Sequence, residues 1–335
     1  MSDKILVPSE HGLTFQANGQ ITGVANAIKE NKITPEEAVR LANANIERLS
    51  ALKNRRFTAQ TLEQRKADFR ADQVARELSF KNRQPFIFPD FSKNGDFFLG
   101  QGLTLVGARS GHSKSTTAAN ILAGFINFKP DTKVQVISNE ENSDAILNRT
   151  ACVLLKLPYM KYYEKKMSQK DREAVDNKAL ELIDRIAVIK SGNDWDTTYV
   201  EDVCAILEEA ENNGFSMTVL DYYQSITRSR DLPDAEHFKI LKMLNPFLRD
   251  YGRRSAIPVV VFAQLAPKST SPDFSSRVQN DRTIYNDSFA SIEIEPDFNS
   301  KLTTFTIHKM RFGNNTGEKV VLKFNQGWYE KVGGI

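Results

Sequence analysis

The residues with the most specific chemistry lie between Leu103 and Ile121, which read L-T-L-V-G-A-R-S-G-H-S-K-S-T-T-A-A-N-I. An apolar run, Leu103–Val106, enters a Gly/Ser loop that delivers Lys114 and Ser115 to the start of a helical pattern. This order of strand, flexible turn, Lys-Ser and helix is typical of a phosphate-binding loop. The N–H groups and dipole at the helix start favour an anion. Lys114 could then contact β- and γ-phosphates, and the Ser115 hydroxyl could bind Mg²⁺.

The match departs from the usual pattern at two positions. Ser113 stands directly before the lysine, where glycine is usual, and Ala108 stands where the first glycine often stands. Serine adopts a positive φ less readily than glycine does. An ordinary Gly/Ser turn with a nearby lysine is therefore the alternative interpretation. The residues expected to surround the nucleotide are contiguous: Ala108, Arg109, Ser110, Gly111, His112, Ser113, Lys114 and Ser115.

Two later apolar strands end in acidic residues. The strand Val134–Ser138 is followed by Asn139-Glu140-Glu141, and the strand Met217–Leu220 by Asp221. In an open α/β sheet, residues beyond the carboxyl ends of the strands line the ligand crevice. Glu140 could orient the water that attacks a γ-phosphate, and Asp221 could hold Mg²⁺. Alternatively, glutamates simply favour a helix N-terminus, and aspartate often follows strands in turns.

A third strand, 257–263, ends in Gln264, whose neutral side chain could sense a γ-phosphate. The next loop, 267–280, contains Lys268, Arg277 and five serines. Such a polar, mildly basic loop suits contact with the backbone of single-stranded nucleic acid, although solvated loops often have the same composition. A second basic cluster, Arg228 and Arg230, follows the Asp221 strand.

Lys309 and Arg311 fall on one face of a predicted strand because side chains alternate with a period of two. Paired cations on a strand often protect a sheet edge. They could instead reach across a subunit boundary and stabilise charge on a transferring phosphoryl group.

From residue 103 onward, β-runs alternate with helical patterns, which predicts an α/β domain with a largely parallel sheet. The last two of the predicted strands flank 314–317 and predict an antiparallel hairpin at the edge of the sheet. The predicted strands are Leu103–Val106, Val134–Ser138, Ile186–Ile189, Met217–Leu220, Pro258–Phe262, Ser291–Glu295, Thr303–His308 and Val320–Phe324. Trp328 or Tyr329 could stack on a base or serve as a core aromatic.

Residues 1–84 are charge-rich and predicted to be a small helical N-terminal region. Helix-start residues coincide at Thr34-Pro35-Glu36-Glu37, and a second helix is predicted from about Thr61. This region is either a helical cap or a linker arm that contacts a neighbouring subunit. The loop-like segment Pro85–Gly102 places the predicted boundary, so that 85–335 form the main domain.

The composition sets further limits. The 335 residues include 45 basic and 42 acidic side chains, giving a net charge of +3, which neither requires nor excludes nucleic acid. Cys152 and Cys204 lie in apolar helical contexts, as expected of reduced thiols. No apolar run reaches the roughly 20 residues of a membrane span. We therefore expect no membrane partner and a cytoplasmic location.

Five short motifs occur in an informative order: A-R-S-G-H-S-K-S, S-N-E-E, V-L-D-Y-Y-Q, V-V-V-F-A-Q-L and H-K-M-R-F-G. In this order they resemble the motifs of DnaB-type replicative helicases, which are hexameric motors with a RecA-like core. The resemblance covers about residues 85–330. The short N-terminal region leaves no room for a primase and fits a compact, phage- or plasmid-like form, or host cytoplasm if phage-encoded.

The resemblance implies a role for each motif. ATP and Mg²⁺ are the implied cofactors, with Glu140 as catalytic base, Gln264 as γ-phosphate sensor and Asp221 holding the metal through water. Lys309 and Arg311 are implied to serve the ATP of a neighbouring subunit. The implied DNA contacts are Arg228, Arg230, Lys268 and Arg277.

Implied partners are single-stranded DNA, five further copies in a homo-hexamer, and a primase, polymerase or helicase loader; the implied polarity is 5′ to 3′. Two alternatives remain open: a RecA-like strand-exchange ATPase that forms filaments, and a nucleotide-binding regulator without turnover.

Overall fold

The structure is a computed structural model that describes residues 5–6, 57–58, 62–82, 84–88, 90–92, 98–99, 102–190, 196–254, 257–311 and 315–332. The chain forms two compact units, Met1–Gln73 and Val74–Ile335. Strands β1 (Ile5–Leu6) and β2 (Phe57–Thr58) pair in the first unit. The predicted helix that begins near Thr34 lies outside the described residues. Helix α3 (Leu62–Asn82) begins where the second helix is predicted and extends across the boundary between the units. The functional division between residues 84 and 85 stays a prediction.

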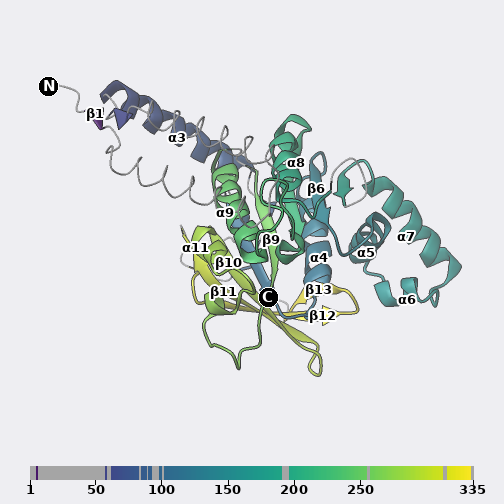
Figure 1. The fold of residues 1–335 in the computed structure, drawn as a ribbon. Helices are drawn as coiled ribbons and strands as arrows, with labels where there is room; N and C mark the ends of the chain where they lie inside the picture. The colour runs from purple at the N-terminus through teal and green to yellow at the C-terminus, as the bar shows by residue number, and fades with distance from the viewer. Residues whose placement is uncertain are drawn as a thin grey trace, which may run out of the picture. The chain divides into compact units, whose positions relative to one another are not determined.

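A nine-stranded sheet organises the second unit, with strand order β13-β12-β11-β10-β5-β9-β8-β6-β7 (Figure 1). The six strands from β10 to β7 run parallel, and β11, β12 and β13 are antiparallel. Their bounds are β5 Leu103–Ala108, β6 Lys133–Ser138, β7 Ile186–Ile189, β8 Phe215–Asp221, β9 Val259–Gln264, β10 Ala290–Asp297, β11 Leu302–Met310, β12 Lys319–Asn325 and β13 Trp328–Lys331. All eight predicted strands are confirmed, as is the α/β class.

The sequence-based prediction is wrong about the edge of the sheet. Strands β11 and β12 form the predicted antiparallel pair, but β13 adds outside β12 through the pairs Asn325–Trp328 and Phe324–Tyr329. This strand has four residues and follows a tight turn in which Gly327 has φ 135°. So short a run carries little periodicity, and its two leading aromatics are explained by burial of Trp328 and Tyr329.

Helices cover both faces of the sheet. One hydrophobic cluster joins the sheet to α4 (Lys114–Phe128), α5 (Ser143–Leu155) and α7 (Gln169–Leu182). The other joins it to α8 (Val200–Asn212), α9 (His237–Arg254) and α11 (Thr283–Asp287). Central strands therefore bury both faces, which explains their nearly continuous apolar runs. The short helices α6 (Tyr159–Tyr163), α10 (Phe274–Arg277) and η1 (Tyr223–Ser225) lie in the connections.

The phenylalanine-rich segment before the sheet belongs to its core. Strands β3 (Gln84–Pro85) and β4 (Phe98–Leu99) pair there. The rings of Phe86 and Phe91 pack edge-on against each other and against Phe305 of β11, at centroid distances of 4.9 to 6.1 Å. A Cβ at Gly124 in α4 would lie 2.3 Å from the carbonyl oxygen of Ile87, so only glycine permits this approach.

Both cysteines are free, as predicted; Cys152 is buried and Cys204 is half-buried. None of the helices in the described residues is both long and apolar enough to cross a membrane.

Candidate active site

The strand ends that carry the predicted site residues meet at one edge of the sheet. In the parallel pairing, Ala108 at the end of β5 aligns with Gln264 at the end of β9. Ser138 at the end of β6 aligns with Asp221 at the end of β8. Because β9 and β8 are neighbours, the four carboxyl ends form a continuous rim. The phosphate-loop candidate rises from this rim.

The loop between β5 and α4 has the backbone that a phosphate loop requires. Ser113 has φ 66° and ψ 26°, and Gly111 has φ 72°, so both lie in the left-handed region. The N–H of His112 donates to the carbonyl oxygen of Arg109 at 3.1 Å and closes the turn. Helix α4 starts at Lys114 and has no acidic residue in its first turn. The positive end of its dipole is therefore not neutralised within the helix and can attract an anion.

Asp221 lies at the rim beside the loop and is only 2% exposed. Burial, together with the charges of Glu140 and Glu141, raises the pKa of Asp221 to about 7, and the positive charge of Lys114 opposes this rise. The ammonium of Lys114 is 5.5 Å from the centroid of the neighbouring Tyr222 ring. Among the described residues, the Asp221 Oδ1 atom is buried without a hydrogen-bond partner. A buried carboxylate oxygen of this kind, on a strand that contacts the helix carrying Ser115, suits a hard cation such as Mg²⁺.

The two glutamates after β6 have different surroundings. Glu141 forms an ion pair with Arg149 of α5 and is partly buried, and the Arg149 guanidinium lies 4.3 Å from the centroid of the Tyr159 ring. Glu140 is exposed, and no described side chain pairs with it. Glu141 therefore has a structural partner, whereas the Glu140 carboxylate is available to act on a ligand at the rim.

Gln264 is half-buried, and a residue that sequence reasoning missed holds its backbone. The side chain of Gln224 accepts from the Gln264 N–H at 2.9 Å and donates to the carbonyl oxygens of Gln264 and Gln279 at 3.2 and 3.0 Å. Gln224 is 7% exposed and comes from η1, directly after the Asp221 strand. It therefore links the ends of β8 and β9, a contact across 40 residues that no local pattern reveals.

Lys309 and Arg311 lie at the opposite edge of the sheet. Met310 of β11 pairs with Ala290 of β10, and Ala290 pairs with Thr104, near the start of β5. The phosphate loop follows the other end of β5. Lys309 and Arg311 therefore do not join the site of their own chain.

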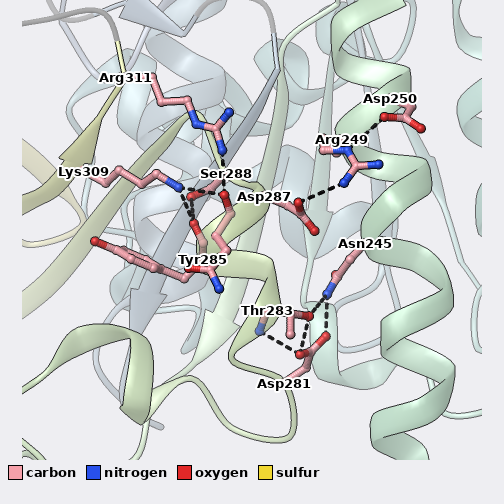
Figure 2. Close-up of polar contacts among 11 residues, drawn as sticks. Asn245, Arg249, Asp250, Asp281, Thr283, Tyr285, Asp287, Ser288, Lys309 and Arg311 are labelled. Atoms are coloured by element: carbon pink, nitrogen blue, oxygen red, sulfur yellow. Dashed lines mark hydrogen bonds and ion pairs between the residues drawn. The ribbon is translucent and has the colours of Figure 1, made fainter.

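Both cations instead bind the end of α11, as Figure 2 shows. The Lys309 ammonium donates to the carbonyl oxygens of Tyr285 and Asn286 at 2.6 and 3.0 Å, and the Arg311 guanidinium donates to that of Asn286 at 2.6 Å. Burial and the charge of Arg311 lower the pKa of Lys309 to about 8, although Asp287 opposes this. Carbonyls at a helix C-terminus are favourable partners for cations.

The four predicted DNA contacts have unequal surroundings. Arg228 is exposed, 5.7 Å from the centroid of the Tyr199 ring. Arg230 pairs with Asp202, with hydrogen bonds of 2.6 and 2.7 Å, and Lys268 pairs with Glu295 at 2.5 Å; about half of each basic side chain stays exposed.

Arg277 is a correction, because it is 1% exposed. Both of its terminal nitrogens bind Glu293 of β10, at 2.7 and 2.6 Å. The sequence places it in a polar loop, but α10 turns its side chain into the protein, so it has no face for DNA.

The sequence comparison agrees with this geometry. Residues 88–281, more than half of the chain, match the family described as DnaB-like helicase C terminal domain. The chain belongs to the DnaB-like helicase family. The predicted family is thus confirmed, and membership implies an ATP-hydrolysing helicase. The matched range of this DnaB-like helicase includes the phosphate loop, Glu140, Asp221 and Gln264, but it ends before Lys309 and Arg311. No protein of curated function matches the sequence.

Solved structures support the fold. The structure titled "The Structure Of A DnaB-Like Replicative Helicase And Its Interactions With Primase" is similar with a TM-score of 0.61 and 13% identity, over 96% of this chain and 78% of that one. A second solved structure, an isolated ATPase domain, gives 0.57 and 14%, over 70% and 85%. A KaiC-like protein, PH0186 from Pyrococcus horikoshii OT3, gives 0.51 and 14%, over 75% and 99%. At these identities the likeness shows the fold alone, and it confirms the predicted RecA-like architecture.

Proposed function

We propose that this DnaB-like helicase is a ring-shaped motor of six copies. It translocates on single-stranded DNA, hydrolyses ATP between neighbouring subunits and separates the strands of duplex DNA. ATP binds at the phosphate loop, with Lys114 on the β- and γ-phosphates and the loop N–H groups around them. Ser115 and Asp221 hold Mg²⁺, which neutralises phosphate charge when bound.

Glu140 is the proposed base that orients and deprotonates the attacking water. Its exposure supports this role, because water and nucleotide can reach its carboxylate, whereas Glu141 is held by Arg149. Gln264 is proposed to contact the γ-phosphate from the neighbouring strand end. Through Gln224, a movement of Gln264 would pass to the backbone of Gln279, at the end of the loop 267–280.

The observation that carries the shared site is the placement of Lys309 and Arg311. They project from the sheet edge opposite to the phosphate loop, so their charges cannot serve the nucleotide of their own chain. Two cations at the far edge suit a ring in which each subunit completes the site of the next. Stabilisation of transition-state charge by such residues increases phosphoryl-transfer rates by about 10³–10⁵.

DNA is proposed to contact the exposed cations that follow the two central strands. Arg228 is exposed, and Arg230 and Lys268 keep exposed faces despite their ion pairs. Arg277 is excluded from this set because of its burial. A primase, polymerase or loader remains a proposed partner, as does Mg²⁺-ATP as the fuel.

The test is DNA-stimulated ATP hydrolysis by the full chain and by Lys114→Ala. We expect single-stranded DNA to stimulate hydrolysis by the wild type and Lys114→Ala to lose at least about 100-fold in rate, since one charge contact in a transition state contributes about 2.7–4 kcal/mol. Hydrolysis retained by Lys114→Ala with an unchanged thermal unfolding temperature would contradict the proposed site.

A further inference from the structure

Ser113 has a backbone conformation that serine disfavours. In the left-handed region the Cβ of an L-residue approaches the following carbonyl oxygen, which is why glycine usually occupies this position. Serine at a helix N-cap ordinarily has an extended backbone and accepts a hydrogen bond from the first turn. Ser113 has φ 66°, and its side chain makes no such capping bond. Its backbone therefore needs support from elsewhere.

Strand β13 supplies a partner directly beneath the loop. Tyr329 is 3% exposed, and its hydroxyl lies 3.0 Å from Thr117 Oγ1 in the first turns of α4. The same hydroxyl hydrogen-bonds to the hydroxyls of Ser113 and Thr303. The Thr117 N–H in turn donates to the Ser113 carbonyl oxygen at 2.9 Å. Ser113 is thus connected to Tyr329 directly through its hydroxyl and indirectly through its carbonyl oxygen.

A second set of contacts fixes the position of Tyr329 relative to α4. The Asn120 side chain accepts from the Tyr329 N–H at 3.0 Å and donates to the carbonyl oxygens of Thr116 and Gly327 at 2.8 and 3.0 Å. Asn120 is 3% exposed. The Tyr329 ring packs edge-on against Phe305 at a centroid distance of 5.2 Å. The hydroxyl of Tyr329 therefore has little freedom to move away from the loop.

We propose that Tyr329 is a positioning residue for the nucleotide: its hydroxyl holds Ser113 in the left-handed conformation and thereby aims the N–H groups of the loop at the phosphates. The pair of Ser113 and Tyr329 takes the place of the usual glycine. This inference rests on the proposed function, because it concerns ATP bound at this loop.

A double-mutant cycle of Ser113→Gly and Tyr329→Phe tests the pair, with the MgADP dissociation constant of the full chain measured by titration calorimetry. In the presence of Ser113, Tyr329→Phe weakens binding about fivefold, or about 1 kcal/mol, as expected for one net hydrogen bond. In the Ser113→Gly background the same change has less than about a twofold effect, because glycine needs no support. Ser113→Ala keeps the Cβ but lacks the hydroxyl, so it weakens binding about fivefold by itself, and Tyr329→Phe adds nothing further.

The matched control is Tyr162→Phe, which removes a tyrosine hydroxyl that donates to Asp176 on an exposed surface at 2.5 Å. Thermal unfolding of every variant shows whether a change in affinity follows from loss of fold. Equal weakening by Tyr329→Phe in both backgrounds, or no weakening in either, would overturn the inference. If Tyr329→Phe fails to fold, Ser113→Ala with affinity equal to that of the wild type would overturn it. Failure of the wild type to bind MgADP would instead overturn the proposed function, and this inference with it.

Discussion

Replacement of Arg277 by methionine distinguishes a buried structural role from a DNA contact. Arg277 and Glu293 are 1% and 3% exposed, and they share two hydrogen bonds of 2.7 and 2.6 Å. His308 makes a third contact with Glu293, at 2.9 Å. Arg277→Met removes one charge and leaves the Glu293 carboxylate buried beside His308 alone.

Two routes give a similar magnitude. Removal of one partner from a buried ion pair costs about 3–5 kcal/mol. Burial by itself raises the pKa of Glu293, but hydrogen bonds from His308 and Arg277 and the charge of Arg277 lower it from 4.5 to about 2. A shift of that size corresponds to about 3 kcal/mol at 1.36 kcal/mol per unit. Because this pKa is lowered on folding, the stabilisation is present above pH 4.5 and is lost as the pH falls through about 2.

Urea and thermal unfolding at pH 7 measure the effect. We expect Arg277→Met to lower the unfolding temperature by roughly 6–15 °C, at about 2–4 °C per kcal/mol. Adding Glu293→Leu should restore most of the loss, since the unpaired charge is then gone. The control is Lys268→Met, which breaks the exposed pair with Glu295 and should cost less than about 1 kcal/mol. The reasoning is refuted if Arg277→Met is no more destabilising than Lys268→Met and mainly weakens DNA binding.

Two further predictions concern the cations at the far edge of the sheet. Because the pKa of Lys309 is lowered to about 8, its charge is lost as the pH rises through 8, so ATP hydrolysis should fall there; Lys309→Arg keeps its charge and should remove this fall, and an unchanged alkaline profile would count against a role for the charge. Copies with Glu140→Gln and copies with Arg311→Ala, each inactive alone, should regain activity at up to about a quarter of sites when mixed in equal amounts, since half of the copies supply each group. No recovery at any mixing ratio would contradict a shared site.

The sequence predicts the carboxyl rim of the sheet well. Strands buried on both faces are continuous apolar runs, and the first polar residue after each run marks its end. Glu140, Asp221 and Gln264 are therefore located by position, although the roles proposed for them still need experiment. Ser113 is informative as well, since the left-handed backbone expected at the usual glycine is present.

Contacts between distant segments could not be predicted in this way. Gln224 and Gln264 are 40 residues apart, and Thr117 and Tyr329 are 212 apart. No periodicity connects such pairs, and only the completed sheet brings them together. Arg277 fails for a related reason, because its polar neighbours predict a solvated loop while its partner Glu293 lies in another strand.

Strand separation on a forked DNA duplex tests the central claim most directly. With ATP and Mg²⁺, the full chain is predicted to release the displaced strand, and Lys114→Ala is predicted to release none. Electron microscopy of the same samples should show six-membered rings. ATP hydrolysis without strand release, accompanied by open helical filaments on single-stranded DNA, would contradict the helicase and favour a strand-exchange ATPase.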